Sequence, residues 1–193
     1  MAAKATTCQK ALKNWEEAHP DQNASEAEEI KFIFQIPPIE KLETNVLNTL
    51  TNCKKLSLSS NAIDKMVPLP NLRNLEILSL SRNQIKKISG LEEIGQTLRE
   101  LWLSYNVIEK LEGLQPCQKL QVLYIGNNKI KNWDEIDKLK ELPEIGSVVF
   151  TGNPIYQNLQ PDEGRAGVLK RVPTLKNVDG LLITEQLLKK FLA

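Results

Sequence analysis

The side chains that could support catalysis or bind a metal are few and lie far apart in this sequence. The single histidine, His19, precedes a proline in a polar segment, and no neighbouring residue offers the partner that a general base or a metal ligand needs. Cys8, Cys53 and Cys117 are an odd number of cysteines at no spacing typical of zinc ligands. We therefore expect reduced thiols, with Cys53 and Cys117 buried in place of apolar residues.

Acidic side chains and glycine-rich loops do not indicate a reactive site either. Asp134, Glu135 and Asp137 form an acidic cluster, which we interpret as a solvated face and not as a metal site. The sequence lacks the G-x-x-x-x-G-K-[ST], G-x-G-x-x-G and G-x-S-x-G motifs, whose residues hold phosphates or a nucleophile. We predict a protein that is not an enzyme and has no cofactor and no metal.

A leucine-rich repeat organises most of the chain. Residues 98–114, LRELWLSYNVIEKLEGL, match the pattern L-x-x-L-x-L-x-x-N-x-I-x-x-L-x-x-L, in which a short strand leads through a turn to a helical or 3-10 return. Other units begin at positions 53, 75, 120 and 145, within the spacing typical of this repeat class. We predict an α/β solenoid of about six repeats, with a parallel β-sheet on one face and helical or 3-10 returns on the other.

Each repeat should place two strand residues in the core and an asparagine at the corner after the strand. The predicted inward pairs are Leu56/Leu58, Leu78/Leu80, Leu101/Leu103, Leu123/Ile125 and Val148/Phe150. An amide at the corner can satisfy backbone groups that the turning chain leaves unpaired, and the corner residues are Asn61, Asn83, Asn106, Asn128 and Asn153. In a degenerate first repeat, residues 29–50, we assign Phe32 and Phe34 to the inward pair and Pro37 to the asparagine position.

Other elements should close both ends of the repeats. Residues 4–18 have the apolar spacing of an amphipathic helix, and Ser25 with Glu28 matches a capping box for a short second helix. Residues 168–172 should form a short helix, followed by a cap with a turn at Asp179-Gly180. A helical tail should carry four apolar residues on one side, Leu187, Leu188, Phe191 and Leu192. The predicted parts are an N-terminal helical cap (1–28), leucine-rich repeats (29–158) and a C-terminal leucine-rich-repeat cap with a tail helix (159–193).

Strand residues that flank the inward pairs face solvent, and in the middle repeats several of them are large and apolar. A patch of this kind, rimmed by polar residues, marks a partner site, and tryptophan and tyrosine are enriched at binding hot spots. The alternative is that the terminal segments fold over the patch and bury it. The candidate partner-binding residues on the sheet face are Ile77, Glu100, Trp102, Tyr105, Val122, Tyr124 and Val149.

Composition and charge exclude several other classes of function. The chain has 193 residues, 41% of them hydrophobic, and its net charge is +1, so no basic field indicates nucleic acid as a partner. No run of about 18 apolar residues indicates a membrane span, and the N-terminus lacks the apolar core of a signal peptide. We expect a soluble intracellular protein with no membrane partner.

Several segments of the sequence resemble the leucine-rich-repeat light chains of axonemal outer-arm dynein. The most specific are ALKNWEEA, IPPIEKLE and ELWLSYN, and the resemblance extends over roughly residues 2–180. It implies a ciliary or flagellar protein of the axonemal cytoskeleton and cytoplasm that binds the stalk-tip microtubule-binding region of a dynein heavy chain and modulates the motor. It also implies tubulin as a candidate second partner. The family's binding face carries over to Trp102 and its neighbours, and its C-terminal basic residues carry over to Arg165, Lys170 and Arg171.

The C-terminal part departs from the family in two ways. Gly164 and Gly167 stand where the family has larger residues, which predicts a weakened cap helix, and the tail after Gly180 is apolar and basic. Two other functions fit a repeat of this class and stay open from the sequence. One is a regulatory scaffold for a protein phosphatase, which normally has many more repeats, and the other is a spliceosomal leucine-rich-repeat protein.

Overall fold

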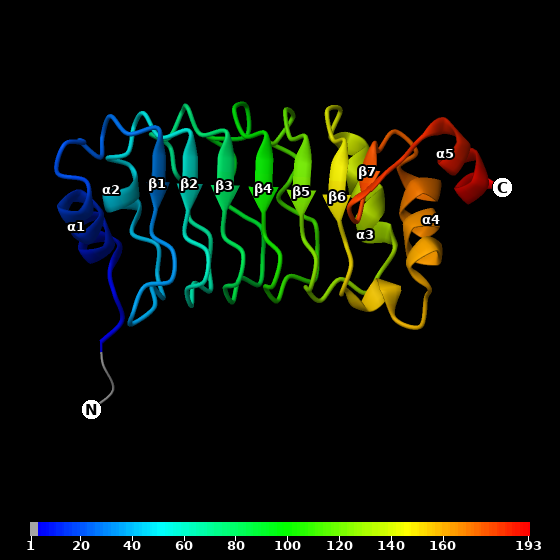
Figure 1. The fold of residues 1–193 in the computed structure, drawn as a ribbon, viewed down its shortest axis with the longest axis horizontal. Coiled ribbons are helices and arrows are strands. Elements are labelled where there is room, and N and C mark those ends of the chain that lie inside the picture. The colour runs from blue at the N-terminus through cyan, green and yellow to red at the C-terminus, as the bar shows by residue number, and fades with distance from the viewer. Residues whose placement is uncertain (1–3) are drawn as a thin grey trace.

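The repeats form one continuous sheet along an elongated molecule. The computed structural model describes residues 4–193, and its strands lie side by side in chain order with the two termini at opposite ends (Figure 1). Strands β1 to β7 are parallel, and β8 pairs antiparallel with β7. The strands are β1 (Glu29–Lys31), β2 (Lys55–Ser57), β3 (Ile77–Ser79), β4 (Glu100–Trp102), β5 (Val122–Tyr124), β6 (Ser147–Val149), β7 (Asn177–Val178) and β8 (Leu181–Leu182). The predicted leucine-rich-repeat solenoid is confirmed.

The strand register stacks the inward side chains in layers. Leu78 lies beside Leu56 on one side and beside Leu101 on the other, and all five predicted inward pairs are buried. A unit of 22 residues cannot bury its apolar face alone, so the layers of neighbouring repeats share one core. This core extends from Cys8 to Phe191, which means that the caps and the repeats are packed as one body. The three-part division at 28/29 and 158/159 stays a prediction.

The corner asparagines join each repeat to the one before it. The Asn106 side-chain amide donates to the carbonyl oxygens of Leu80 and Leu103, at 3.0 and 2.9 Å, and its Oδ1 accepts from the Ile85 N–H at 2.9 Å. Asn83, Asn128 and Asn153 repeat this arrangement and are buried. The corners therefore satisfy backbone groups that the turn would otherwise leave unpaired.

The first repeat differs from its predicted alignment by two residues. The ladder pairs Ile30 with Leu56, so the buried inward residues are Ile30 and Phe32. Phe34 is 68% exposed, with a positive φ of 50°, and it occupies the corner position that Ser60 has in the next repeat. The asparagine position consequently belongs to Gln35 and not to Pro37. The prediction was wrong because this register depends on pairing with β2, which the local pattern does not reveal.

The N-terminal cap contains one helix of the expected kind. Helix α1 (Cys8–Ala18) begins after Thr7, whose hydroxyl accepts from the Lys10 N–H at 3.0 Å, while residues 4–7 are not helical. No helix forms over residues 25–28. Glu28 forms an ion pair with Lys54 at 2.6 Å across the strand ends, so the predicted capping box was wrong. The return of the first repeat contains α2 (Thr44–Leu47).

The C-terminal cap helix is longer than predicted. The predicted residues 168–172 overlap the end of α4 (Pro161–Arg171), which starts where the Glu163 carboxylate accepts from the Gln160 N–H at 2.7 Å. The helix continues through Gly164 and Gly167 without a break. A Cβ at Gly164 would lie 2.8 Å from the Tyr156 ring, and one at Gly167 would lie 2.5 Å from the Trp133 ring. The glycines thus make room for two aromatic rings, and the weakening expected from them stays a prediction.

The remaining elements complete the C-terminal end. They are α3 (Asp134–Asp137), η1 (Lys138–Glu141), η2 (Pro154–Tyr156) and α5 (Glu185–Leu192). The turn at Asp179-Gly180 joins β7 to β8 as expected, with positive φ at both residues. The tail helix packs on α4 and buries Phe191, but Leu192 is 43% exposed and lies outside the packed side. None of the helices in residues 4–193 is both long and apolar enough to cross a membrane.

Candidate protein-binding surface

The candidate site is the solvent face of strands β3 to β6. We call Ile77, Trp102, Val122, Tyr124 and Val149 the sheet-face patch. The ladder places Tyr124 between Trp102 and Val149 in one row, while Glu100 lies between Ile77 and Val122 in the adjacent row. All five patch side chains are half-buried, so their apolar surface is accessible while their backbones are fixed in the sheet. The structure therefore brings together the residues that the sequence selected.

Trp102 is held in place by two contacts, one with a patch residue and one with the neighbouring Glu100. Its ring stacks on Tyr124, with ring centroids 5.8 Å apart, and its Nε1 donates to the Glu100 carboxylate at 3.0 Å. Stacking of this kind contributes about 0.5–1.5 kcal/mol beyond the area that it buries. The indole is thereby held in one orientation, and an ordered side chain loses less entropy in a contact than a mobile one.

Tyr105 borders the patch at the corner after β4. It is 48% exposed and has a positive φ of 60°, the conformation that Arg82 also has at the preceding corner. The Arg82 guanidinium lies 4.4 Å from the centre of the Tyr105 ring. This cation–π contact places the Arg82 charge against an aromatic face.

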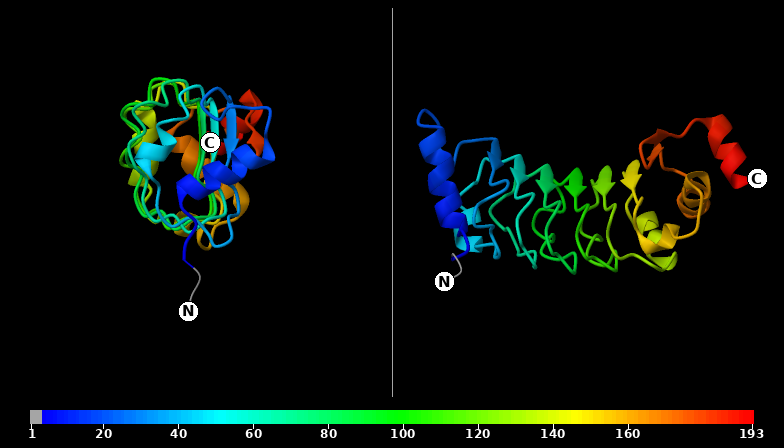
Figure 2. Two further views of the ribbon diagram at one scale, coloured as in Figure 1. Left: turned by 90° about the vertical axis from the view of Figure 1, so that its left-hand side faces the viewer. Right: turned by 60° about the horizontal axis from the view of Figure 1, so that its bottom comes forward.

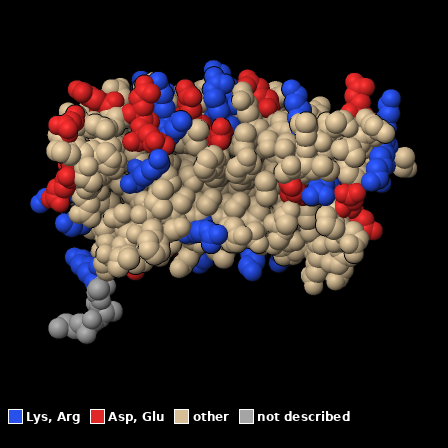
Figure 3. All heavy atoms as spheres, viewed as in Figure 1, with Lys and Arg blue, Asp and Glu red and all other residues tan. Residues whose placement is uncertain are grey.

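The surface around the patch is largely uncharged. Figure 3 shows many charged side chains along the upper rim and others at the two ends and the lower edge, with mostly other residues over the middle of this face. Ser79 and Ser57 continue the row of Trp102 toward the N-terminal cap, and the hydroxyl oxygens of Ser59 and Ser79 lie 2.7 Å apart. An apolar patch with a polar rim is the surface composition expected for a protein contact.

Ile33 extends this surface beyond the residues that the sequence selected. It is 42% exposed and lines a hollow of about 240 Å³ next to Trp102 and Ile77, with Lys31 and Lys55 at the edge. Side-chain alternation places Ile33 on the facing side in the predicted alignment and in the observed one, because Phe32 is inward in both. The sequence-based selection missed it because it considered facing residues only from the repeat at Cys53 onward.

The terminal elements do not cover the patch. Helix α1 contacts α2 at one end of the sheet, and α5 contacts α4 at the other end. Figure 2 shows both caps standing at the ends of the strand row, with the middle strands open between them. The alternative that the chain buries its own patch is therefore wrong for the part of the chain that the structure describes.

The three C-terminal basic residues do not form one free basic surface. Lys170 is exposed, but the Arg165 side chain contacts Asp162 at 3.1 Å. The Arg171 guanidinium lies 4.9 Å from the Trp133 ring centre, and its Nε lies 3.8 Å from an Asp137 oxygen. Both arginines therefore make contacts within the cap.

The three cysteines and His19 are held by packing and hydrogen bonds and do not form a reactive cluster among residues 4–193. All three cysteines are free and buried, and burial raises the pKa of Cys53 to about 11 and that of Cys117 to about 12. The His19 ring stacks on Trp15, with its Nδ1 2.8 Å from the Trp15 carbonyl oxygen. No group of three or more potential metal ligands occurs in residues 4–193.

The acidic cluster is only partly solvated, contrary to the interpretation from the sequence. Glu135 is buried, and its carboxylate accepts from the Leu111 N–H and from the Lys138 ammonium, both at 2.7 Å. It satisfies a backbone donor of the preceding repeat, much as the corner asparagines do. The i to i+3 spacing of Glu135 and Lys138 was a signal for this pair.

Comparison with known proteins places the sequence in a family. The family model described as Leucine Rich repeats (2 copies) matches residues 51–93 and 96–142. The chain is 56% identical over 186 residues to dynein axonemal light chain 1 of Xenopus laevis, covering 95% of each chain. It is 52% identical over 183 residues to dynein axonemal light chain 1 of Chlamydomonas reinhardtii, covering 93% of this chain and 91% of the relative.

A solved structure supports the same fold at much lower sequence identity. Internalin C2 of Listeria monocytogenes matches 98% of this chain and 95% of its own, with a TM-score of 0.56 and 20% identity. At this identity the likeness shows the fold alone. The family assignment rests on the two relatives, which match nearly the whole of this chain. The chain belongs to the dynein axonemal light chain 1 family.

Proposed function

We propose that this chain is a non-catalytic regulatory light chain of axonemal outer-arm dynein. In this proposal it binds the stalk-tip microtubule-binding region of a dynein heavy chain and modulates ciliary or flagellar motility. It acts in the axoneme, as part of the cytoskeleton. The relatives named dynein axonemal light chain 1, which match nearly the whole chain, support the dynein role.

The observation that carries the binding site is the ordered sheet-face patch around Trp102. Its aromatic and branched residues come from four adjacent strands, and the strands hold them in fixed positions. A partner that covers them would gain apolar burial with little ordering cost on this side. We propose Trp102 and Tyr124 as the centre of the contact, with Ile77, Glu100, Tyr105, Val122 and Val149 around them.

We also propose a smaller contact between the C-terminal cap and the heavy chain. Lys170 is the exposed member of the three basic residues and is the candidate for a charged contact with the heavy chain. Arg165 pairs with Asp162 within α4, and Arg171 holds the end of this helix against Trp133. An exposed charge of this kind contributes more to the association rate than to affinity.

The deciding experiment measures heavy-chain binding by a variant that lacks the Trp102 indole but keeps the fold. Trp102→Ala should weaken binding to a purified heavy-chain stalk-tip fragment by about 2 kcal/mol, roughly 30-fold in Kd. Trp102→Phe keeps the ring on Tyr124 and should lose much less. Leu182→Ala, at a 66% exposed leucine in the C-terminal cap, is a matched control that should bind like wild type.

Calorimetry and thermal unfolding would test this proposal together. An intact Trp102→Ala variant that binds the fragment as tightly as wild type does would refute the sheet-face site. A wild-type chain that binds no heavy-chain fragment would refute the proposed function itself. Co-purification of a phosphatase catalytic subunit without dynein heavy chain from ciliated cells would favour the phosphatase scaffold.

A further inference from the structure

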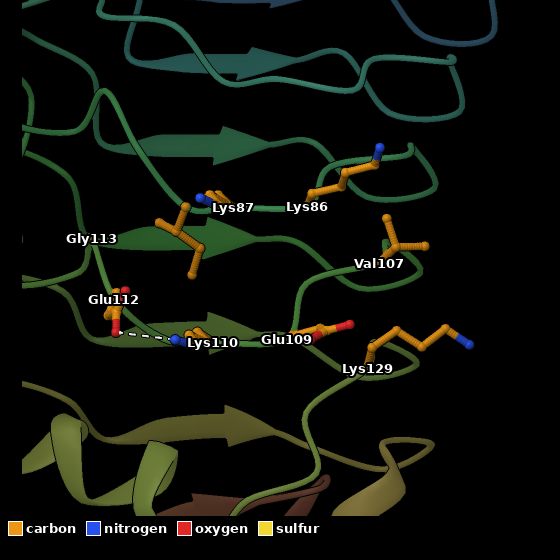
Figure 4. Close-up of a pocket in the computed structure, with 9 residues that line it drawn as sticks. Lys86, Lys87, Val107, Glu109, Lys110, Glu112, Gly113 and Lys129 are labelled. Carbon is orange, nitrogen blue, oxygen red and sulfur yellow. Dashed lines mark ion pairs between the residues drawn. The ribbon is translucent and has the colours of Figure 1, made fainter.

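A second surface lies on the flank where the chain leaves the corner asparagines. Two hollows, of about 590 and 340 Å³, are lined by residues of neighbouring repeats, and Lys86 and Lys87 line both. Lys129 lines the larger hollow and Lys65 the smaller one. We call Lys65, Lys86, Lys87 and Lys129 the lysine flank. Figure 4 shows the larger hollow, with Val107 drawn between Lys86 and Lys129.

The carboxylates in the larger hollow are already paired within the chain. Glu109 lies 4.0 Å from the ammonium of Lys131, and Glu112 lies 3.8 Å from Lys110 and 3.6 Å from Lys138. The Glu112 to Lys110 pair is marked in Figure 4. These pairs leave little uncompensated negative charge in this hollow.

The four lysines of the flank have no such partner. All are exposed, and none lies within ion-pair distance of a carboxylate among residues 4–193. Asp64 is the one unpaired carboxylate that lines either hollow. The flank therefore has a net positive charge of about three, although the whole chain is nearly neutral. Such a local excess attracts an acidic partner.

The floor of the larger hollow is apolar. Ile88 is buried below it, Val107 is half-buried, and Gly113 exposes backbone. A Cβ at Gly113 would collide with the Ile88 carbonyl oxygen, and the positive φ of 96° also disfavours a larger residue. The hollow thus combines an apolar floor with a cationic rim. An inorganic anion would use only the rim, whereas a peptide with acidic and apolar side chains would use both.

The length of the flank limits the size of the ligand. Lys65 and Lys129 belong to repeats three steps apart, and adjacent strands are about 4.8 Å apart, which gives roughly 14 Å. An extended peptide rises about 3.3 Å per residue. We propose that the lysine flank binds a short, extended acidic peptide segment of about four residues. This inference goes beyond the proposed function and does not depend on it, because the flank shares no residue with the sheet-face patch.

The test uses the full chain and a labelled peptide of alternating glutamate and isoleucine. The variant K65Q/K86Q/K87Q/K129Q should lose at least tenfold in affinity by fluorescence anisotropy. The matched control removes four other exposed, unpaired lysines in K10Q/K41Q/K119Q/K176Q and should stay within twofold of wild type. Since the contact is electrostatic, affinity should also fall between 50 and 300 mM salt.

Three outcomes would overturn the inference. One is an equal loss in both quadruple variants, which would indicate a response to net charge alone. Another is absence of peptide binding by folded wild type. The third is tighter binding at the same lysines to a polyuridine oligonucleotide or to vesicles containing phosphatidylserine, which would assign a different class of ligand. Both variants change exposed side chains, so circular dichroism should show them folded.

Discussion

Substitution of Gly167 by alanine tests how the C-terminal cap is packed. In an ordinary helix interior this change stabilises by about 1 kcal/mol, because glycine loses more backbone entropy than alanine. Here the new Cβ would lie 2.5 Å from Cη2 of Trp133, and two further atoms of the same ring would lie within about 3 Å. Overpacking of this kind costs about 1–3 kcal/mol.

The ring has little freedom to move away. The Arg171 guanidinium lies 4.9 Å from its centre, and the Tyr156 ring stacks against it at a centroid distance of 6.2 Å. We therefore expect the clash to exceed the gain in helix propensity, with a net loss of about 1 kcal/mol in the free energy of unfolding. In a Trp133→Ala background the clash is absent, and the same Gly167→Ala change should stabilise by about 1 kcal/mol.

Urea unfolding of the four proteins in this double-mutant cycle measures the difference directly. The expected coupling energy is about 2 kcal/mol. The packing explanation would be refuted if Gly167→Ala stabilised the wild-type background, or if the two substitutions were additive within about 0.5 kcal/mol. The reversal of sign is the informative result, because general helix effects would be the same in both backgrounds.

Three further predictions concern the core, the thiols and the tail. Asn106→Ala should cost about 3 kcal/mol or more in urea unfolding, since it leaves three buried backbone groups without their partner; a loss below 1 kcal/mol would contradict the corner model. Burial raises the pKa of Cys53 and Cys117 above 9.0, so their contribution to stability is complete below pH 9 and lost as pH rises through 11 and 12. The free energy of unfolding of the wild type should therefore fall from pH 8 to 10.5 relative to a Cys53→Ala/Cys117→Ala variant. A rise in the wild type that is absent from the variant would refute this thiol contribution. The hydrogen bond from Lys190 lowers the pKa of Asp162 below 3.8, so this tail contact is present above about pH 4 and lost in stronger acid. Asp162→Asn should loosen α5 at pH 7 by amide exchange, and unchanged exchange there would show that the pair does not hold the tail.

The repeats could be predicted because their determinants are local. The leucine positions and corner asparagines from Cys53 onward fix both the strand and its register, and the patch follows from side-chain alternation. Trp102 could be selected in this way without any knowledge of its neighbours. Its stacking on Tyr124 and its hydrogen bond to Glu100 also follow once the repeats are aligned, because these residues lie on adjacent strands or two positions apart.

The features that could not be predicted depend on contacts between distant segments. Phe34 resembles an inward residue by spacing, but pairing of β1 with β2 places it at an exposed corner. Gly164 and Gly167 lower helix propensity, yet their lack of side chains is what allows α4 to pack on two rings. Glu135 stands in a charged run, which predicted a solvated side chain. The fold instead buries it against the Leu111 N–H, 24 residues earlier.

The row of facing residues that contains Trp102 also gives the solenoid a direction. Each strand contributes one residue to this row, so the polarity of the row can be followed from the N-terminal cap to the C-terminal cap. The first three strands contribute polar residues and the next three contribute apolar ones, and the full order is Lys31, Ser57, Ser79, Trp102, Tyr124 and Val149. A partner that covers both halves matches this surface in one orientation only, because reversal would place its apolar groups against Lys31 and its polar groups against Trp102. Since the corner asparagines hold adjacent repeats together, the bound partner would be oriented relative to the whole solenoid, including the lysine flank.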